Sequence, residues 1–390
     1  MTQSRAPRVL RQATDPRRAS YLELFFDLAF IFALMRLSRH LLADLSVAGA
    51  ARTFLLLAAL WAVWVTTAWS ANWYDTGNRV TREFLIAVMF GGLLMAASVP
   101  EAFGRHAMVF AGAYLAVHVG RGLGFSLALR GHPRVWRSLR IVMAFGFTGV
   151  PWVAGILIPQ AREALWALAV FLDYLMTRLR WPIPWAGRST WEELRVFGEH
   201  LSERYEQIFI VALGELILAV GGAYSDSGFD TARSIAFALA FLNAALLAVV
   251  YFIPREGRLG TVIDESDVPG RLAMDTAFLH LALIGSVVAT AVGDELAIQH
   301  PHSPTPTSVV AVTVGGTVLF LVGRNLTAYL IDRRPPWAGL SALAALLVLI
   351  PALLRLPPPA SIAASDLVLF GIVAHQYVTT RLANKPEPSA

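Results

Sequence analysis

The sequence predicts an all-α integral membrane protein that crosses the bilayer many times. Of its 390 residues, 56% are hydrophobic and only 15% are charged, whereas a soluble domain carries about 25% charged residues. Apolar runs of the length that a bilayer core requires, about 20 residues, recur about twelve times along the chain. The runs lack the alternating pattern of a membrane β-barrel, so we expect each of them to be a helix.

The predicted spans follow one another with short connections. The first six cover residues 21–42, 53–74, 84–99, 107–129, 139–159 and 163–179, and the second six cover residues 201–223, 231–253, 273–292, 309–330, 339–354 and 364–380. The third and the eleventh are short. Two halves of six spans would have the same orientation, related by an axis along the membrane normal.

This count predicts five segments. They are a cytoplasmic Arg-rich segment at 1–20, a first membrane half at 21–180, a cytoplasmic linker at 181–198, a second membrane half at 199–382 and a disordered tail at 383–390. The linker contains Pro182 and Pro184 and a group of tryptophans, which are typical of a membrane–water interface. The first twenty residues are polar and contain no apolar core, so no cleavable signal peptide is predicted.

The arginines in the connections predict the orientation of the chain. Every second connection is basic, and these connections hold Arg79 and Arg82; Arg130, Arg134 and Arg137; Arg178, Arg180, Arg188 and Arg195; Arg255, Arg258 and Arg271; and Arg333 and Arg334. Cytoplasmic loops of membrane proteins carry an excess of Lys and Arg. The alternation therefore predicts that both termini lie in the cytoplasm.

Several function classes are disfavoured by the sequence. Cysteine is absent, which excludes disulfides and cysteine-ligated metals. The net charge is +5, but the basic residues are dispersed over short loops, so binding to nucleic acid is not predicted. The chain contains no Walker loop and no glycine-rich dinucleotide fingerprint. We therefore expect no cofactor and no metal site.

Two carboxylates in the first span are the strongest candidates for a functional site. Glu23 and Asp27 are four residues apart, so they lie on nearly the same face of a helix. An acid at membrane depth costs at least ~2.5 kcal/mol, so Asp27 is expected to have a partner. The orientation places Glu23 near the cytoplasmic surface and Asp27 about one turn deeper.

The seventh span has a comparable layout. It begins with a charged turn that contains His200, Glu203 and Arg204 and then runs apolar until Glu215. Arg204 and Glu215 lie on the same face but about 16 Å apart along the axis, too far to pair directly. We therefore predict that Asp27 and Glu215, one from each half, share a polar core.

Other polar residues at predicted membrane depth are further candidates for this core: His118 and Arg121, Asp275 and His280, and Arg324 and Asn325. In each case the alternative is a hydrogen bond or ion pair that only holds helices together, worth ~0.6 kcal/mol on average. For single polar residues such as Asp173, Asn243 and His375, this structural alternative is favoured.

Three segments resemble the bacterial low temperature requirement A family. They are Glu-Leu-Phe-Phe-Asp-Leu-Ala-Phe-Ile-Phe-Ala from Glu23, His-Leu-Ser-Glu-Arg from His200 with Val-Ala-Leu-Gly-Glu ending at Glu215, and Arg-Leu-Ala-Met-Asp from Arg271 with Phe-Leu-His-Leu from Phe278. The resemblance extends from Ser20 to about Arg381. It implies a multi-pass protein of the cell inner membrane, named for growth in the cold, but supplies no catalytic residues. Phe278 stands where many relatives have tyrosine.

Three functions fit these observations. The first is a transporter or channel for an ion, a proton or a small polar solute, in which Arg204, Arg121 or Arg324 would balance the carboxylates. The second is a lipid-modifying enzyme with an acid–base cluster of His200, Glu203, Arg204, Asp275 and His280, although no known catalytic motif is present. The third is a non-catalytic accessory protein in cold or stress adaptation. We expect the first and no enzymatic activity, with the lipid bilayer and the solute as partners and a homo-oligomer left open.

Overall fold

The computed structural model of the protein describes residues 9–12, 18–252, 258–303 and 305–383. Within these residues every regular element is a helix, and the only extended pairings are two isolated bridges. The all-α prediction is confirmed for this part of the chain. The predicted disordered tail, apart from Ala383, and most of the predicted N-terminal segment lie outside the described residues.

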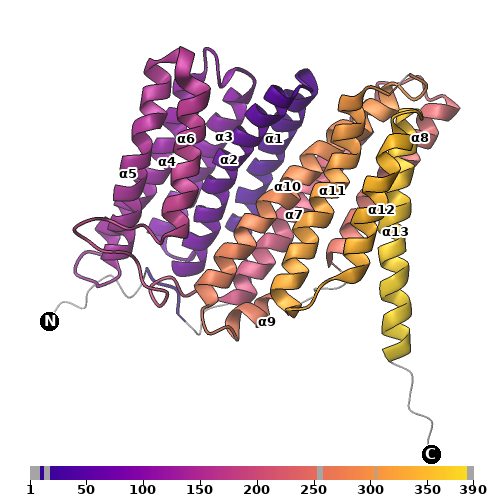
Figure 1. The fold of residues 1–390 in the computed structure, drawn as a ribbon. Helices are drawn as coiled ribbons and strands as arrows, with labels where there is room; N and C mark the ends of the chain where they lie inside the picture. The colour runs from indigo at the N-terminus through magenta and orange to yellow at the C-terminus, as the bar shows by residue number, and fades with distance from the viewer. Residues whose placement is uncertain (1–8, 13–17, 253–257, 304, 384–390) are drawn as a thin grey trace, which may run out of the picture. The chain divides into compact units, whose positions relative to one another are not determined.

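Each predicted apolar run is a helix (Figure 1). The helices are α1 (Tyr21–Ala43), α2 (Val47–Trp73), α3 (Arg79–Ser98), α4 (Ala107–Ala128), α5 (Val135–Leu157), α6 (Arg162–Arg178), α7 (Gly198–Ser225), α8 (Thr231–Phe252), α10 (Pro269–Gln299), α11 (Thr307–Asp332), α12 (Trp337–Leu353) and α13 (Pro358–Ala383). The short helix α9 (Arg258–Asp264) and two 3-10 turns, η2 (Val99–Glu101) and η3 (Pro159–Ala161), were not predicted.

Nine of the described helices are long and apolar enough to cross a membrane: α2, α3 together with η2, α4, α5, α7, α8, α10, α11 and α13. Helix α12 is apolar but has only 17 residues, and α6 is equally short. Helix α1 has 23 residues and contains Glu23 and Asp27. Multiple spans are therefore supported by length and composition.

Several helices begin earlier than the apolar runs predict, because polar residues cap them. The Ser46 side chain accepts a hydrogen bond from Gly49 N (3.0 Å), so α2 starts six residues before the predicted Thr53. The Asn78 side chain accepts one from Val80 N (3.0 Å) and starts α3 at Arg79. A capping side chain satisfies a backbone N–H that the first turn leaves free. Hydropathy alone does not predict where such a cap starts a helix.

The described chain forms two compact units. Unit 1 comprises Met1–Val211 and Leu259–Phe278, and unit 2 comprises Ala212–Arg258 and Leu279–Ala390. Helices α7 and α10 therefore each contribute residues to both units. These units are defined by contacts and differ from the two membrane halves, 21–180 and 199–382, whose boundaries stay a prediction.

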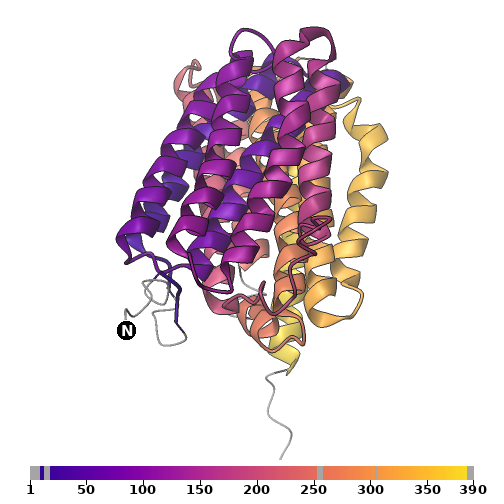
Figure 2. The ribbon, with the colours of Figure 1, turned by 90° about the vertical axis from the view of Figure 1, so that its left-hand side faces the viewer.

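Unit 1 is a bundle of helices that pack along their lengths. Helix α4 packs between α3 and α5, α5 also packs against α6, and α1 contacts α2 and α3. Figure 2 shows the purple and magenta helices of this unit running side by side, with the indigo helices behind them. Large aromatic side chains fill its interior, and Trp64, Trp152 and Trp166 are fully buried.

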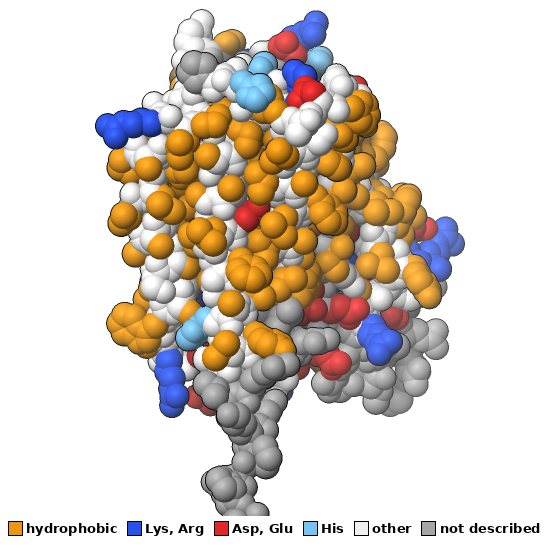
Figure 3. All heavy atoms as spheres, turned by 90° about the vertical axis from the view of Figure 1, so that its right-hand side faces the viewer, with side chains coloured by type: hydrophobic (Ala, Val, Ile, Leu, Met, Phe, Trp, Pro, Cys, Tyr) orange, Lys and Arg blue, Asp and Glu red, His pale blue; other side chains and the backbone are white. Residues whose placement is uncertain are grey.

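Unit 2 contains α8 packed against α13, with α11 and α12 also in contact with α13. Figure 3 shows that hydrophobic side chains cover the middle of the face formed by α8, α12 and α13, while most charged side chains lie near its two ends. Exposed residues on these helices include Phe241, Val348, Leu367 and Phe370. An apolar belt between charged rims is the surface that a helix bundle presents to lipid.

Helices α10 and α11 approach each other closely in unit 2, and glycines permit this approach. A Cβ added at Gly316 would meet the side chain of Thr290, with its backbone N at 2.9 Å and Ser286 O at 3.1 Å. A Cβ at Gly293 would lie 2.6 Å from the Cα of Thr313. Small residues at such crossings let backbones pack directly in membrane proteins.

We expect the substitution Gly316→Ala to lower the free energy of unfolding by about 1–3 kcal/mol, because the added methyl overpacks the crossing. The neighbouring Gly315 provides a matched control, since a Cβ there meets nothing within 4 Å. Gly315→Ala should raise stability by up to about 1 kcal/mol through helix propensity. Unfolding in detergent micelles measures both, and equal effects of the two variants would contradict the close approach.

Candidate functional site: a buried acid–base cluster

Glu23 occupies the first turn of α1 and takes part in its cap. The Ser20 side chain accepts a hydrogen bond from Glu23 N (3.3 Å), and Glu23 Oε1 accepts one from Ser20 N (3.0 Å). This reciprocal arrangement is a capping box, and it fixes where the helix starts. The other carboxylate oxygen, Oε2, is left to face the interior of unit 1, where Glu23 is only 1% exposed.

Asp27 lies one turn further along α1 and is bound by two donors. Both terminal nitrogens of Arg204, on α7, donate to its carboxylate, with Nη1 2.6 Å from Oδ2 and Nη2 2.6 Å from Oδ1. The indole Nε1 of Trp64, on α2, donates to Oδ1 at 2.8 Å. Asp27 and Arg204 are each 1% exposed. A bidentate pair of this kind is the strongest geometry available to a guanidinium and a carboxylate.

His200 and Arg204, one turn apart on α7, both face Glu23. His200 Nε2 lies 3.1 Å from Glu23 Oε2, and Arg204 Nε lies 3.5 Å from the same oxygen. Asn72 Nδ2 donates to Phe197 O (2.9 Å) and lies 3.1 Å from His200 Nδ1. Because an amide nitrogen can only donate, Nδ1 is an acceptor and the ring proton is on Nε2, directed at Glu23.

The four side chains Glu23, Asp27, His200 and Arg204 form one cluster, which we call the acid–base cluster. It contains two carboxylates and one guanidinium, and its histidine is neutral in the tautomer that Asn72 selects. The cluster therefore carries one negative charge that its own groups do not balance. Arg11 also acts on His200 electrostatically, so positive charge near the cluster comes from outside its four members as well.

Two other predicted residues of α7 have different positions. Glu203 lies beside the cluster, where its carboxylate accepts hydrogen bonds from Ala19 N (3.0 Å) and Gln207 Nε2 (3.2 Å). Gln207 in turn accepts one from Arg204 Nη1 (2.9 Å). Glu215 is buried and belongs to unit 2, whereas Asp27 belongs to unit 1. The predicted pairing of Asp27 with Glu215 thus stays a prediction.

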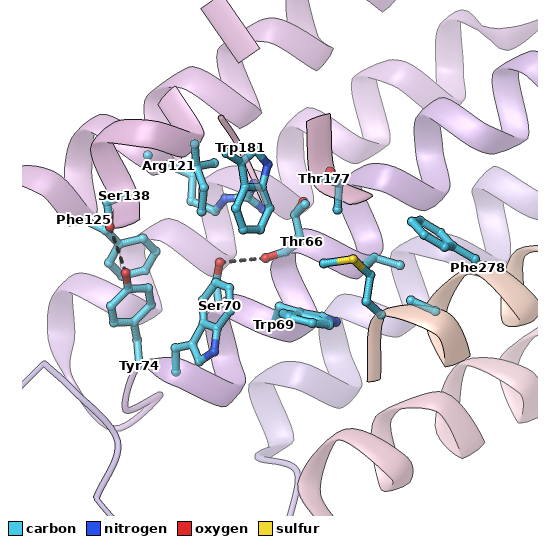
Figure 4. Close-up of a pocket in the computed structure, with 16 residues that line it drawn as sticks. Thr66, Trp69, Ser70, Tyr74, Arg121, Phe125, Ser138, Thr177, Trp181 and Phe278 are labelled. Carbon is cyan, nitrogen blue, oxygen red and sulfur yellow. Dashed lines mark hydrogen bonds between the residues drawn. The ribbon is translucent and has the colours of Figure 1, made fainter. Parts of the chain in front are cut away.

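His118 and Arg121 share a face of α4, as predicted, and are in contact. Arg121 Nη2 lies 3.2 Å from His118 Nδ1, and the His118 ring stacks on Phe145 with 3.9 Å between centroids. Neither residue joins the acid–base cluster. Arg121 instead lines a cavity of about 50 Å3 whose walls are mainly apolar (Figure 4).

The two members of the predicted enzyme cluster that lie on α10 each have a contact of their own. Asp275 belongs to unit 1 and pairs with Arg178 at 3.6 Å. His280 belongs to unit 2, where its Nε2 lies 2.9 Å from Tyr251 Oη. Their clustering with His200, Glu203 and Arg204 stays a prediction.

Arg324 and Asn325 are neighbours on α11 in unit 2. Arg324 Nη1 donates to Asn325 Oδ1 at 3.3 Å. Arg324 also lines a cavity of about 360 Å3 together with Asp332, Trp337 and His375. Within the described residues no three His, Asp or Glu side chains are grouped closely enough to hold a metal ion.

The structure adds site residues that the sequence interpretation missed. Trp64 and Asn72 hold Asp27 and His200, but tryptophan and asparagine in an apolar run give no signal of their own. In unit 2, Asp294 is 0% exposed, and it interacts electrostatically with Asp366, which accepts a hydrogen bond from Asn243 at 2.9 Å. Asp294 was missed because the predicted span ends at Val292, whereas α10 continues to Gln299.

We expect Asp294→Asn to raise the free energy of unfolding by about 1–3 kcal/mol, because it removes an ionisable group whose two carboxylate oxygens have no hydrogen-bond partner among the described residues. Asparagine keeps the volume. The measurement is unfolding in micelles near neutral pH, with Asp226→Asn on the exposed surface as the control, for which no change is expected. Destabilisation by Asp294→Asn would show that the carboxyl has a stabilising partner.

Comparison with known proteins agrees with the motifs. The family described as bacterial low temperature requirement A protein (LtrA) matches residues 18–374. An uncharacterized protein of Rhizobium meliloti (strain 1021) is 34% identical over 349 residues, which is 87% of this chain and 85% of the relative. No solved structure matches the chain. Matches of this extent identify the chain as a member of the bacterial low temperature requirement A family.

Proposed function

We propose that the protein is a proton-coupled transporter or channel for an ion or a small polar solute. The observation that carries this proposal is the acid–base cluster, in which four ionisable side chains are buried in contact with one another. Buried carboxylates and histidines in membrane helices are characteristic of proton and ion pathways.

The two pairs of side chains in the cluster have different roles in this proposal. Asp27 and Arg204 neutralise each other through two short hydrogen bonds and form the fixed part. Glu23 and His200 face each other at 3.1 Å and form the part that takes up a proton. A proton added at His200 Nδ1 would oppose the amide of Asn72, so proton uptake is coupled to a shift of Asn72 and of the Phe197 backbone that it binds.

The membrane arrangement that we propose has twelve spans in two six-helix halves of like orientation, with both termini in the cytoplasm and the chain in the cell inner membrane. The agreement between the predicted runs and the helices supports it, since α1, α6 and α12 complete the nine helices that are long and apolar enough to cross. Partners in this proposal are the lipid bilayer and the solute. A role in adaptation to cold or stress agrees with the description of the family.

Proton flux into proteoliposomes that contain a pH-sensitive dye tests the proposal. We expect an imposed pH gradient to dissipate faster with the protein than in empty vesicles, and addition of the correct ion or solute to change that rate. If the flux rates of cations, amino acids and protons all equal those of empty vesicles, the transporter proposal is wrong. An altered lipid composition in a deletion strain, without any flux, would favour the lipid-modifying enzyme.

A further inference from the structure

Arg121 is a buried cation without an acidic partner among the described residues. It is 5% exposed and lies two turns before the end of α4. Its hydrogen-bonding neighbours are Thr67 Oγ1 at 3.5 Å and His118 Nδ1 at 3.2 Å, both uncharged. A guanidinium removed from water without an anion is strongly disfavoured, so its position calls for a negatively charged ligand.

The cavity beside Arg121 is suited to an apolar chain. It is partly open, and Trp69, Trp73, Phe125, Trp181 and Phe278 supply much of its wall. Figure 4 shows Arg121, Trp181 and Thr66 around the same hollow. A second cavity of about 30 Å3 adjoins it and shares Thr66, Thr177 and Phe278. Asp173 also lines the second cavity, so a negatively charged group is expected at Arg121 in the first cavity and only an uncharged part of the ligand in the second.

We propose that this cavity binds an amphiphilic monocarboxylate, such as a long-chain fatty acid, with its carboxylate on Arg121 and its chain along the aromatic wall. Arg121 supplies the only positive charge among the described lining residues, so a single negative charge is matched, whereas a phosphate monoester would keep a second one. The volume of about 50 Å3 holds a few water-sized groups. This is enough for the carboxylate and the first methylenes, with the rest of the chain passing out through the open side of the cavity, and it is too small for a glycerophosphate head. The proposal is independent of the acid–base cluster.

Quenching of tryptophan fluorescence by a brominated fatty acid tests this site, because Trp69, Trp73 and Trp181 line it. We expect saturable quenching of the purified protein in detergent by the acid and much weaker quenching by its methyl ester, which lacks the charge. Arg121→Gln should weaken binding of the acid by about tenfold or more and leave the ester unchanged. Phosphatidylglycerol in excess should not displace the acid.

Two further variants keep the test decisive. Ala277→Leu fills the cavity from its wall and leaves Arg121 in place, so it should weaken binding of the acid as well. Arg130→Gln removes an exposed arginine near the end of the same helix and should have no effect. Equal binding of acid and ester by the unmodified protein would overturn the proposal even if Arg121→Gln failed to fold, and so would displacement of the acid by phosphatidylglycerol.

Discussion

Replacement of Arg204 by Gln is expected to lower the free energy of unfolding by about 3–5 kcal/mol, because it leaves the buried carboxylate of Asp27 without its cation. Arg204 donates both short bonds to Asp27 and is only 1% exposed. The loss of a partner in such a pair costs far more than the pair contributes as a whole, since the remaining charge stays buried. Denaturant unfolding in micelles measures the change.

The surface pair of Arg52 and Glu163 provides a matched control. Arg52 Nε lies 2.9 Å from Glu163 Oε1, a separation similar to those in the buried pair, but the two side chains are 37% and 52% exposed. Arg52→Gln should therefore lower the free energy of unfolding by at most about 1 kcal/mol. The double variant Asp27→Asn with Arg204→Gln should recover part of the lost stability, because Asp27 is then no longer a buried charge without its cation; the recovery is partial because Glu23 still loses its contact with Arg204 Nε at 3.5 Å. Equal destabilisation by the single and double variants would indicate that Arg204 acts through packing rather than through charge.

The helices could be predicted from the sequence because apolar runs of spanning length have one stable conformation in a bilayer, in which the helix satisfies its own backbone. Their ends could not be predicted from hydropathy, since Ser46 and Asn78 extend α2 and α3 through side-chain caps. The short helix α9 has too few residues to leave a periodic signal. The start of α1 at Tyr21 agrees with the predicted span, and the Ser20–Glu23 spacing is that of the capping box which fixes it.

The residues of the acid–base cluster were partly predictable because helical periodicity determines which side chains share a face. Helical periodicity places Glu23 and Asp27 on one face of α1 and His200 and Arg204 on one face of α7, and the structure shows these two faces in contact. Which faces meet depends on packing between helices distant in the chain, so the sequence also offered Arg121 and Arg324 as counter-charges. Asn72 selects the tautomer of His200, and no sequence pattern reports such a contact.

Glu23→Gln is expected to abolish proton uptake while the protein stays folded. Glutamine at the third position of a helix can still bond back to the cap residue, so the contact with Ser20 N should survive. The substitution removes the carboxylate that faces His200 and leaves Asp27 and Arg204 as a neutral pair. Without that carboxylate, no acidic oxygen that can accept a proton is left facing His200.

The readout is the proteoliposome flux measured together with thermal unfolding in micelles. We expect the flux of Glu23→Gln to fall to the level of empty vesicles with little change in the unfolding temperature, whereas Glu163→Gln, an exposed acid paired with Arg52, should retain the flux of the unmodified protein. A folded Glu23→Gln variant with normal, pH-dependent flux would place the proton site elsewhere, and the buried pair of Asp294 and Asp366 would then be the next group to test. The separation of flux from stability distinguishes a proton-binding role of Glu23 from its role in the helix cap, because the two roles use different oxygens of the same carboxylate.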